Sequence, residues 1–377
     1  MSLSASVAAL DRAVDRALAE RRIVGCVVLL AEAGRLVHAR AAGFADRESG
    51  RPMRRATWLR YASVSKPFTT VAALRLMQTG RLTPEDPVTR WLPDFTPALP
   101  DGSRPVITVD QLMAHLAGLD YGFNQPPDGP YARAQVSDGI GDSGLSLAEN
   151  LRRIASVPLD RLPGTRWRYS VATDVLGAVI EAAADMPLPE AMARLVTDPL
   201  GVEAGFHAPD SVDLAANYAD ARPEPRRMRG PTRVRNPLQP EQGYAYLPER
   251  IRDPSAYPSG GGGMAGTAEA ALALLETLRE GSFLAGNLRA EARRNRIRQR
   301  HPLRGPGWGH AWAGAVITEA EAAGIGLPQG SLGWGGIYGH SWIVDPARRR
   351  SLVALTNTAL EGMNGAFAVE IAAALAL

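Results

Sequence analysis

The 377-residue sequence has little of the side chains on which several kinds of site depend. It contains one cysteine, Cys26, so an intrachain disulfide is excluded, and the apolar residues around Cys26 predict a buried, inert thiol. No apolar run reaches the length of about 18 residues that a membrane span needs. Residues 1–22 show a charged, helically spaced pattern that is unlike a secretory signal. These absences predict a soluble cytoplasmic protein with no membrane partner.

The sequence also has little excess of charge of either sign and few patterns that suggest metal binding. The 42 basic and 39 acidic residues leave a net charge of +3, which gives little support to a nucleic-acid partner. The arginine-rich run 289–304 is therefore expected to be a solvated helix face. His115, His310 and His340 lack metal-ligand spacing, so we expect structural or pocket-lining roles for them. Nothing in the sequence specifies an oligomeric state.

Lysine is the scarcest of the basic residues. Of the 42 basic side chains one is a lysine, Lys66, and all the others are arginines. Arginine stays protonated at any working pH, whereas a lysine that is desolvated or placed beside another cation can release its proton. Among the 42 lysine and arginine side chains, Lys66 is therefore the one suited to general-base chemistry.

Lys66 follows Ser63 by three residues at the start of a helical segment. Residues with this spacing share a helix face, so the hydroxyl and the amine can meet. Pro67 fits the first turn of a helix, where backbone N–H groups have no partner inside the helix. A serine there would also lie at the positive end of the helix dipole. The alternative is a surface lysine that follows a serine by chance. With 19 serines in 377 residues, a given lysine has this spacing by chance about once in twenty cases.

Two further elements could complete a site around Ser63. Tyr169 directly precedes an apolar helical segment, and a phenol beside a cationic amine is stabilised as phenolate and can accept the serine proton. Taken alone, Tyr169 would be a packing aromatic at a helix start. The run 332–339, Leu-Gly-Trp-Gly-Gly-Ile-Tyr-Gly, predicts a strand whose backbone can approach a ligand closely, with a tight turn as the alternative.

Hydrophobic periodicity predicts sheet-forming segments at both ends of the chain and helices between them. Residues 24–31 and 36–42 should form a hairpin, and 221–262 should be a long surface connection. We expect one α/β domain from residues 1–62 plus 256–377 and a mainly helical lobe from 63–255, with the active site in the cleft between them. Other helices and strands are expected at 71–78, 109–116, 147–154, 173–184, 267–279 and from 367 to the end, and at 311–318, 341–344 and 352–356.

Ser63 with Lys66, then Tyr169, then the glycine-rich run 332–339 follow one another along the chain. In this order they resemble the motifs of the beta-lactamase-like serine hydrolases, and in particular those of the bacterial family VIII carboxylesterases of the EstB type. Further segments that carry the resemblance are Gly43-Phe44-Ala45-Asp46-Arg47-Glu48, the run from Asp86 to Pro93, Tyr257-Pro258-Ser259-Gly260-Gly261, and Trp334-Gly335-Gly336-Ile337-Tyr338-Gly339-His340-Ser341-Trp342.

The resemblance implies a beta-lactamase or penicillin-binding-protein fold, α/β (α+β) in class, with an antiparallel sheet flanked by the N- and C-terminal helices and an inserted helical lobe. It implies that Ser63 attacks an ester carbonyl while Lys66 and Tyr169 carry its proton, without metal or organic cofactor. The oxyanion hole would consist of the backbone N–H groups of Ser63 and Ile337. The residues expected to bind the small-molecule ester are Trp334, Gly335, Gly336, Tyr131 and Asp174.

Two departures from relatives that act on beta-lactams shape the expected specificity. Val171 stands where those relatives have an asparagine, and Trp334-Gly335-Gly336 replaces their Lys-Thr-Gly. An indole cannot pair with a carboxylate, so esters should be favoured over anionic beta-lactams unless an arginine from another segment supplies the charge.

Several other hypotheses stay open. An acyltransferase would use the same acyl-enzyme, as would a beta-lactamase or D-aminoacyl-peptidase-like hydrolase, and a binding protein could have kept the fold without turnover. Ser143 in Gly141-Asp142-Ser143-Gly144-Leu145 is not expected to be a nucleophile, because Leu145 breaks the G-x-S-x-G spacing.

Overall fold

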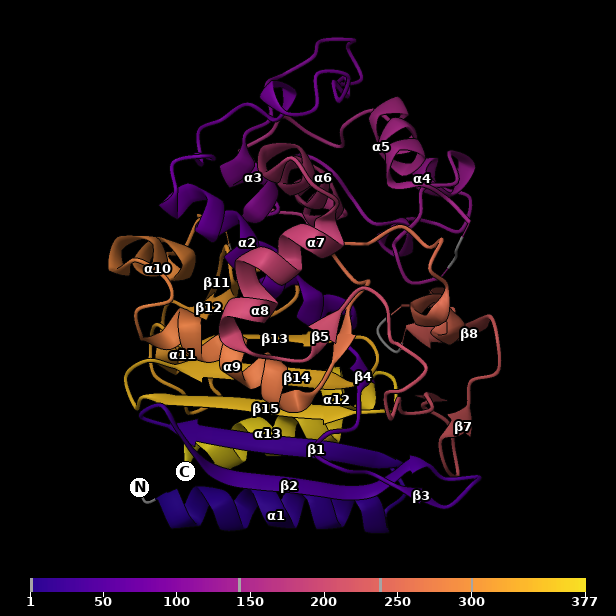
Figure 1. The fold of residues 1–377 in the computed structure, drawn as a ribbon, viewed down its shortest axis with the longest axis vertical. Helices are drawn as coiled ribbons and strands as arrows, with labels where there is room; N and C mark the ends of the chain where they lie inside the picture. The colour runs from indigo at the N-terminus through magenta and orange to yellow at the C-terminus, as the bar shows by residue number, and fades with distance from the viewer. Residues whose placement is uncertain (1–2, 142–143, 237–238, 300) are drawn as a thin grey trace.

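The centre of the fold is an eight-stranded antiparallel sheet (Figure 1). The computed structural model describes residues 3–141, 144–236, 239–299 and 301–377. Every strand pairing in the sheet is antiparallel, and the chain leaves the sheet after β3 at one edge and returns as β11 at the opposite edge. In spatial order the strands are β11 (Trp308–Ala311), β12 (Gly314–Ile317), β13 (Leu332–Gly336), β14 (His340–Asp345), β15 (Arg350–Thr356), β1 (Gly25–Glu32), β2 (Arg35–Asp46) and β3 (Arg51–Pro52).

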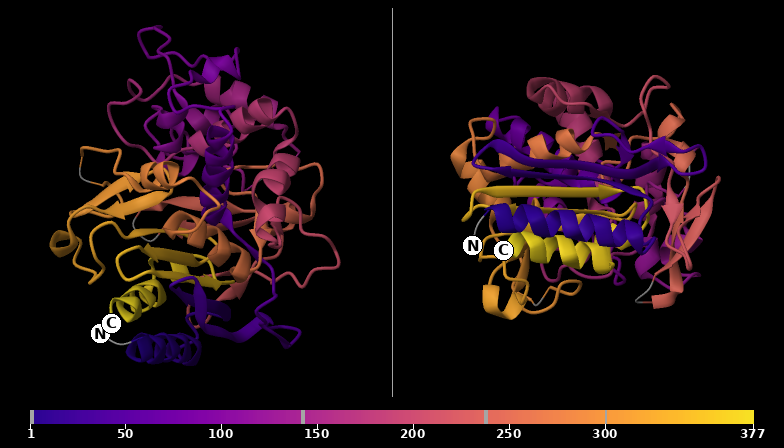
Figure 2. Two further views of the ribbon diagram at one scale, coloured as in Figure 1. Left: turned by 60° about the vertical axis from the view of Figure 1, so that its left-hand side comes forward. Right: turned by 90° about the horizontal axis from the view of Figure 1, so that it is seen from below.

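Strand β1 lies inside the sheet and is buried on both faces, which explains why it is a continuous apolar run in the sequence. Cys26, Val28 and Leu30 belong to one hydrophobic core, and the alternate residues Val27 and Leu29 belong to the other. Helices α1 (Leu3–Ala19) and α13 (Ala366–Ala376) lie side by side over the first core, and the two chain ends are close together (Figure 2).

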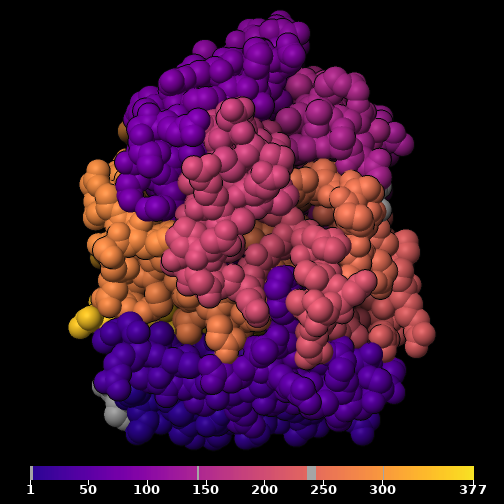
Figure 3. All heavy atoms as spheres, in the orientation of Figure 1, coloured from indigo at the N-terminus to yellow at the C-terminus, as the bar shows by residue number. Residues whose placement is uncertain are grey.

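The opposite face is covered by α9 (Ala268–Arg279) and by the segment that begins with α2 (Ser65–Gln78). α2 is buried on nearly all sides because it lies beneath further helices of the lobe, among them α6 (Ala172–Ala184). The N-terminal residues form the base of the molecule in Figure 3, and the chain just beyond them forms its top. The other helices are α3 (Val109–Met113), α4 (Pro130–Arg133), α5 (Leu147–Ser156), α7 (Leu188–Met192), α8 (Asp198–Leu200), α10 (Gly286–Arg293), α11 (Ala320–Ala323) and α12 (Glu361–Asn364).

Three small sheets complete the architecture. β4 (Leu59–Arg60), β10 (Ala265–Gly266) and β5 (Ala204–Gly205) form one of them, so segments far apart in the sequence meet directly before Ser63. The other two are the pairs β6 (Tyr218–Ala219) with β7 (Arg226–Arg227) and β8 (Thr232–Asn236) with β9 (Gln239–Tyr246).

The expected fold class is confirmed, and most of the expected elements are present. The hairpin appears as β1 and β2, and the helix expected at 267–279 begins one residue later as α9. Two expectations were wrong. Residues 311–318 contribute the end of one strand and the whole of the next, because the chain turns at Trp312 and Ala313 between β11 and β12. The stretch 221–262 was expected to be a surface connection, yet it carries strands β7, β8 and β9.

The division at residues 62 and 255 stays a prediction, and β5 from the middle segment pairs with β10 from the C-terminal one. Within the described ranges, no helix is long and apolar enough to cross a membrane.

Candidate active site

Ser63 lies in a short 3-10 turn, Ala62–Val64, between β4 and α2. The preceding residue, Ala62, has a φ of +46°, a left-handed conformation that is unfavourable for a residue with a Cβ atom. Tyr61 is held by a hydrogen bond from its backbone N–H to the carbonyl of Met264, so the strained turn is fixed on its N-terminal side. Only 6% of the Ser63 surface is exposed, and the helix that follows keeps its hydroxyl in one place.

Lys66 is on the first turn of α2, on the same side as Ser63, as the spacing predicts. Its side-chain nitrogen donates to Ser63 Oγ at 3.3 Å and to the carbonyl of Gly261 at 2.6 Å. The Gly261 backbone can come this close because it has no side chain: a Cβ atom there would lie 2.8 Å from Asp174 Oδ2 and 3.0 Å from the Tyr121 hydroxyl. The amine is therefore buried and held against the serine.

Tyr169 reaches Ser63 from the opposite side. Its hydroxyl donates to Ser63 Oγ at 2.7 Å, and the Lys66 nitrogen lies 4.8 Å from the centre of its ring. The segment is anchored by the neighbouring Arg168, whose guanidinium donates two hydrogen bonds of 2.8 Å to the carboxylate of Asp120. The structure thus brings Ser63, Lys66 and Tyr169 together from two separate segments.

Strand β13 forms the wall beside this cluster. The indole N–H of Trp334 donates to the Tyr169 hydroxyl at 3.2 Å. Trp334 therefore offers the site a hydrogen-bond donor in addition to an apolar ring. Gly336 lies against the serine turn: a Cβ atom on it would be 2.4 Å from the carbonyl oxygen of Tyr61. Ile337 directly follows, and its carbonyl accepts a hydrogen bond of 2.9 Å from the Tyr246 hydroxyl. Gly335 packs on the far side, toward the His340 carbonyl and Met363.

The remaining two expected residues lie behind the cluster. Asp174 is fully buried in the first turn of α6, where burial raises the pKa of its carboxyl group and Lys66 acts in the opposite direction. Tyr131 is 3% exposed, and its hydroxyl accepts a hydrogen bond from the backbone N–H of Asp120 at 3.1 Å. Tyr131 therefore supports the loop around Asp120, and within the described chain no contact joins it to Ser63, Lys66 or Tyr169.

Three aromatic residues near the site were missed by sequence reasoning. Tyr121 packs on Tyr169 with ring centres 5.2 Å apart, Phe123 stacks on Tyr121 at 4.5 Å, and Tyr244 from β9 packs on Phe123 at 5.1 Å. No local pattern distinguishes these side chains in the sequence, because they converge only when the loop after α3 and strand β9 are folded together.

Three buried histidines form a second layer behind Tyr169 and Trp334. His115 packs on Tyr169 at 5.0 Å, His310 packs edge-on against Trp334 at 5.4 Å, and His301 Nε2 lies 3.2 Å from His310 Nδ1. Burial lowers the pKa of all three, that of His301 to about 3. In the described part of the chain, no group of acidic, histidine and cysteine side chains is arranged to hold a metal ion.

The arginine-rich run 289–304 is not one solvated helix face, and that expectation was wrong. α10 ends at Arg293, and the described residues between it and β11, 294–299 and 301–307, contain no helix. Arg296 lies 3.8 Å above the ring of Trp312, and the Arg304 guanidinium lies 5.3 Å from the ring centres of both Trp308 and Trp334. An arginine from another segment therefore does lie beside Trp334.

Ser143, which was not expected to be a nucleophile, lies outside the described residues.

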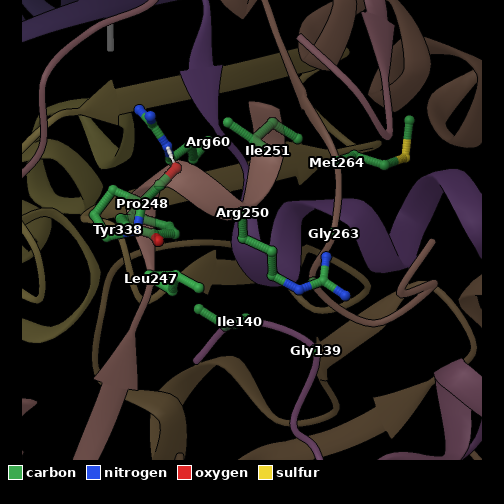
Figure 4. Close-up of a pocket in the computed structure, with 11 residues that line it drawn as sticks. Arg60, Gly139, Ile140, Leu247, Pro248, Arg250, Ile251, Gly263, Met264 and Tyr338 are labelled. Atoms are coloured by element: carbon green, nitrogen blue, oxygen red, sulfur yellow. Dashed lines mark hydrogen bonds between the residues drawn. The ribbon is translucent and has the colours of Figure 1, made fainter. Parts of the chain in front are cut away.

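A small cavity lies between β4 and the segments around Ile140, Pro248 and Gly263 (Figure 4). Arg60, Arg250 and Tyr338 line it, and the Arg60 guanidinium donates to the carbonyl of Pro248 at 2.6 Å. Its volume of about 20 Å³ has room for about one water molecule, so it is too small for a substrate.

Comparison with known proteins agrees with this geometry. The family described as Beta-lactamase matches residues 10–376. Esterase EstB of Burkholderia gladioli is 46% identical over 373 residues, which cover 98% of this chain and 95% of that protein. The solved structure of EstCE1, described as a hydrolase with promiscuous acyltransferase activity, has a TM-score of 0.96 at 43% identity and covers 99% of both chains.

A more distant solved structure shares the fold alone. Simvastatin synthase LovD of Aspergillus terreus has a TM-score of 0.74 at 21% identity, with 98% of each chain covered. The family match over nearly the whole length and the identity to an esterase show that the chain belongs to the beta-lactamase family and is a hydrolase akin to its esterases.

Proposed function

We propose that the protein is a serine carboxylesterase that cleaves small to medium carboxylic esters through an acyl-enzyme on Ser63. The observation that carries the proposal is the convergence of two proton-carrying groups on one hydroxyl: Tyr169 OH at 2.7 Å and Lys66 Nζ at 3.3 Å from Ser63 Oγ. The esterases among its relatives support this assignment of substrate class.

The proposed reaction has two halves. Ser63 Oγ attacks the ester carbonyl while its proton passes to the Tyr169 oxygen, and Tyr169 hands its own proton to the unprotonated amine of Lys66. The departing alcohol then takes a proton from Tyr169 as the ester C–O bond breaks, and Lys66 returns its extra proton to Tyr169. The acyl group is then bonded to Ser63. In the second half, water attacks the acyl carbonyl and its proton passes through Tyr169 to Lys66 in the same way, and the proton returns through Tyr169 to Ser63 as the carboxylic acid leaves.

Two groups stabilise negative charge on the Tyr169 oxygen during these transfers. The Trp334 indole donates to that oxygen at 3.2 Å, and the Lys66 ammonium lies 4.8 Å from the centre of the ring. The tetrahedral oxyanion would be bound by the backbone N–H groups of Ser63 and Ile337. The close approach of Gly336, which precedes Ile337, to Tyr61 beside the serine turn supports this part of the proposal. Gly335 and Gly336 would leave room for the ester beside β13.

An acyltransferase is the second candidate function, in which an alcohol takes the place of water on the acyl-enzyme. It is favoured by the description of EstCE1 as a hydrolase with promiscuous acyltransferase activity. The aromatic side chains of Tyr121, Phe123 and Tyr244 near the site would suit an organic acceptor. Formation of a new ester when an alcohol is added to the reaction would reveal this activity.

We also propose that the protein works in the cytoplasm. Cys26 is fully buried in the sheet, and burial raises the pKa of its thiol to about 12, so it is an inert core residue.

The test is a panel of p-nitrophenyl esters of increasing chain length beside a chromogenic cephalosporin. Short and medium esters should be cleaved, and ring opening should be poor or absent, because Val171 offers no amide to the beta-lactam side chain. Tyr169→Phe should lower kcat/KM for the best ester by about a hundredfold, the range for a group that transfers protons. Ring opening as fast as ester cleavage would instead place the protein with the beta-lactamases.

A further inference from the structure

The side of the site formed by Trp334 carries a positive charge for which the proposed esterase reaction has no use. Arg304 lies on a turn that joins the end of the arginine-rich run to β11, and its guanidinium is 5.3 Å from the ring centres of Trp308 and Trp334. Trp334 in turn donates to the Tyr169 hydroxyl, which contacts Ser63. A single indole ring thus separates the cation from the cluster around the serine.

The backbone around Arg304 is held in place by a buried side chain. The amides of Leu303 and Arg304 both donate to Nδ1 of His301 at 3.2 Å, and the Gly305 amide donates to the His301 carbonyl at 2.9 Å. Because Nδ1 accepts these bonds, the proton of the neutral His301 ring is on Nε2, where it can be donated to His310 at 3.2 Å. The turn is therefore fixed to the same histidine layer that supports Trp334.

Among the residues that the structure describes, no carboxylate pairs with this arginine. Within the described ranges, Arg304 makes no ion pair, and acidic groups of the neighbouring segments are already paired: Glu291 lies 2.7 Å and Asp110 lies 3.2 Å from the Arg296 guanidinium. Arg304 is exposed as a residue, and its guanidinium carbon lies 5.3 Å from the ring centres of both tryptophans. The planar fork of N–H donors that a guanidinium carries can bind a carboxylate with two hydrogen bonds.

We propose that Arg304 binds a carboxylate carried by the substrate, so that this esterase acts preferentially on esters that bear a second, anionic group. The proposal rests on the proposed function and adds a substrate class to it: half-esters of dicarboxylic acids or acyl esters of hydroxy acids. Trp334 itself cannot pair with an anionic substrate, and Arg304 would be the arginine from another segment that supplies the charge partner.

Matched pairs of anionic and neutral esters test the proposal. One pair carries the charge on the acyl side, mono-p-nitrophenyl glutarate against p-nitrophenyl butyrate, and the other carries it on the alcohol side, 3-acetoxybenzoate against 3-tolyl acetate. Arg304→Met should lower the anionic-to-neutral ratio of kcat/KM by about tenfold or more in at least one pair, because it removes a charge-assisted hydrogen bond and keeps an apolar side chain on the tryptophans. Arg304→Lys should lie between the two.

Arg294→Gln is the matched control, since Arg294 is exposed in the same run and its loss changes the net charge equally. Its ratio should stay within about twofold of wild type, and added salt should lower the ratio in wild type and in this control but not in Arg304→Met. An unchanged ratio in Arg304→Met for both pairs would overturn the proposal.

A binding measurement separates this proposal from the esterase reaction itself. In the Ser63→Ala background, calorimetry with monomethyl glutarate should show binding that weakens about tenfold or more on Arg304→Met. This result would support the anion site even if no ester were turned over, whereas equal binding in both proteins would refute it even if esters were cleaved.

Discussion

At Lys66, charge and the ability to release a proton can be separated by mutation. Arginine keeps the positive charge but cannot give up its proton, so Lys66→Arg should lower kcat for ester cleavage nearly as far as Lys66→Ala, by about a hundredfold or more. The comparison of the two variants with wild type under saturating p-nitrophenyl butyrate measures this. If Lys66→Arg retained wild-type kcat, Lys66 would be a source of charge alone.

Trp334 shows how one residue can be placed correctly and described incompletely from sequence. Its position in a glycine-rich strand predicts a wall of the site, and its side chain does lie there, half-buried. The hydrogen bond from its indole to Tyr169, and the arginine on its other side, depend on which segments fold against β13. Neither neighbour is near Trp334 in the sequence.

Among the elements, strand β13 and the serine turn must approach closely, and Gly336 is the point of contact. A methyl group there would meet the backbone carbonyl of Tyr61, which cannot move without shifting Ser63. Gly336→Ala should lower kcat more than tenfold and destabilise the protein by about 1–3 kcal/mol. Gly333→Ala is the control, because its nearest neighbour would be the Trp342 carbonyl at 3.2 Å. Equal activity of the two variants would contradict this role of Gly336.

The sequence predicts those elements whose signals are local. The three-residue spacing of Ser63 and Lys66 and the scarcity of lysine indicate a reactive amine before any fold is known. The strand expected at 311–318 was misplaced, because the two turn residues, Trp312 and Ala313, are apolar and look like a continuation of the strand. Arg304 was placed on a helix because a run of arginines resembles a solvated face, whereas its environment is created by the fold.

On the scale of the whole molecule, buried histidines should make stability depend on pH. Burial lowers the pKa of His301 to about 3 and of His340 to about 4, and it holds the pKa of His115 and His310 well below the usual value. The unfolded chain takes up protons below about pH 6.5 and the folded protein does not, so stability is complete above that pH and falls as the pH drops toward 4.

Urea unfolding at pH 7.5 and 5.0 measures this loss. Each such histidine should lower the free energy of unfolding by roughly 1.4 kcal/mol per pH unit below 6.5. His340→Gln should therefore show a shallower dependence than wild type, while equal stability of the wild type at the two pH values would mean that these rings are protonated in the folded protein.

The central claim is that Ser63 is the nucleophile, and covalent labelling tests it most directly. After treatment with a fluorophosphonate, mass spectrometry of the digested protein should find the adduct on Ser63, and Ser63→Ala should lose both the adduct and at least about a thousandfold of ester turnover. An adduct on another serine, such as Ser143, or a Ser63→Ala protein with wild-type turnover would contradict the account.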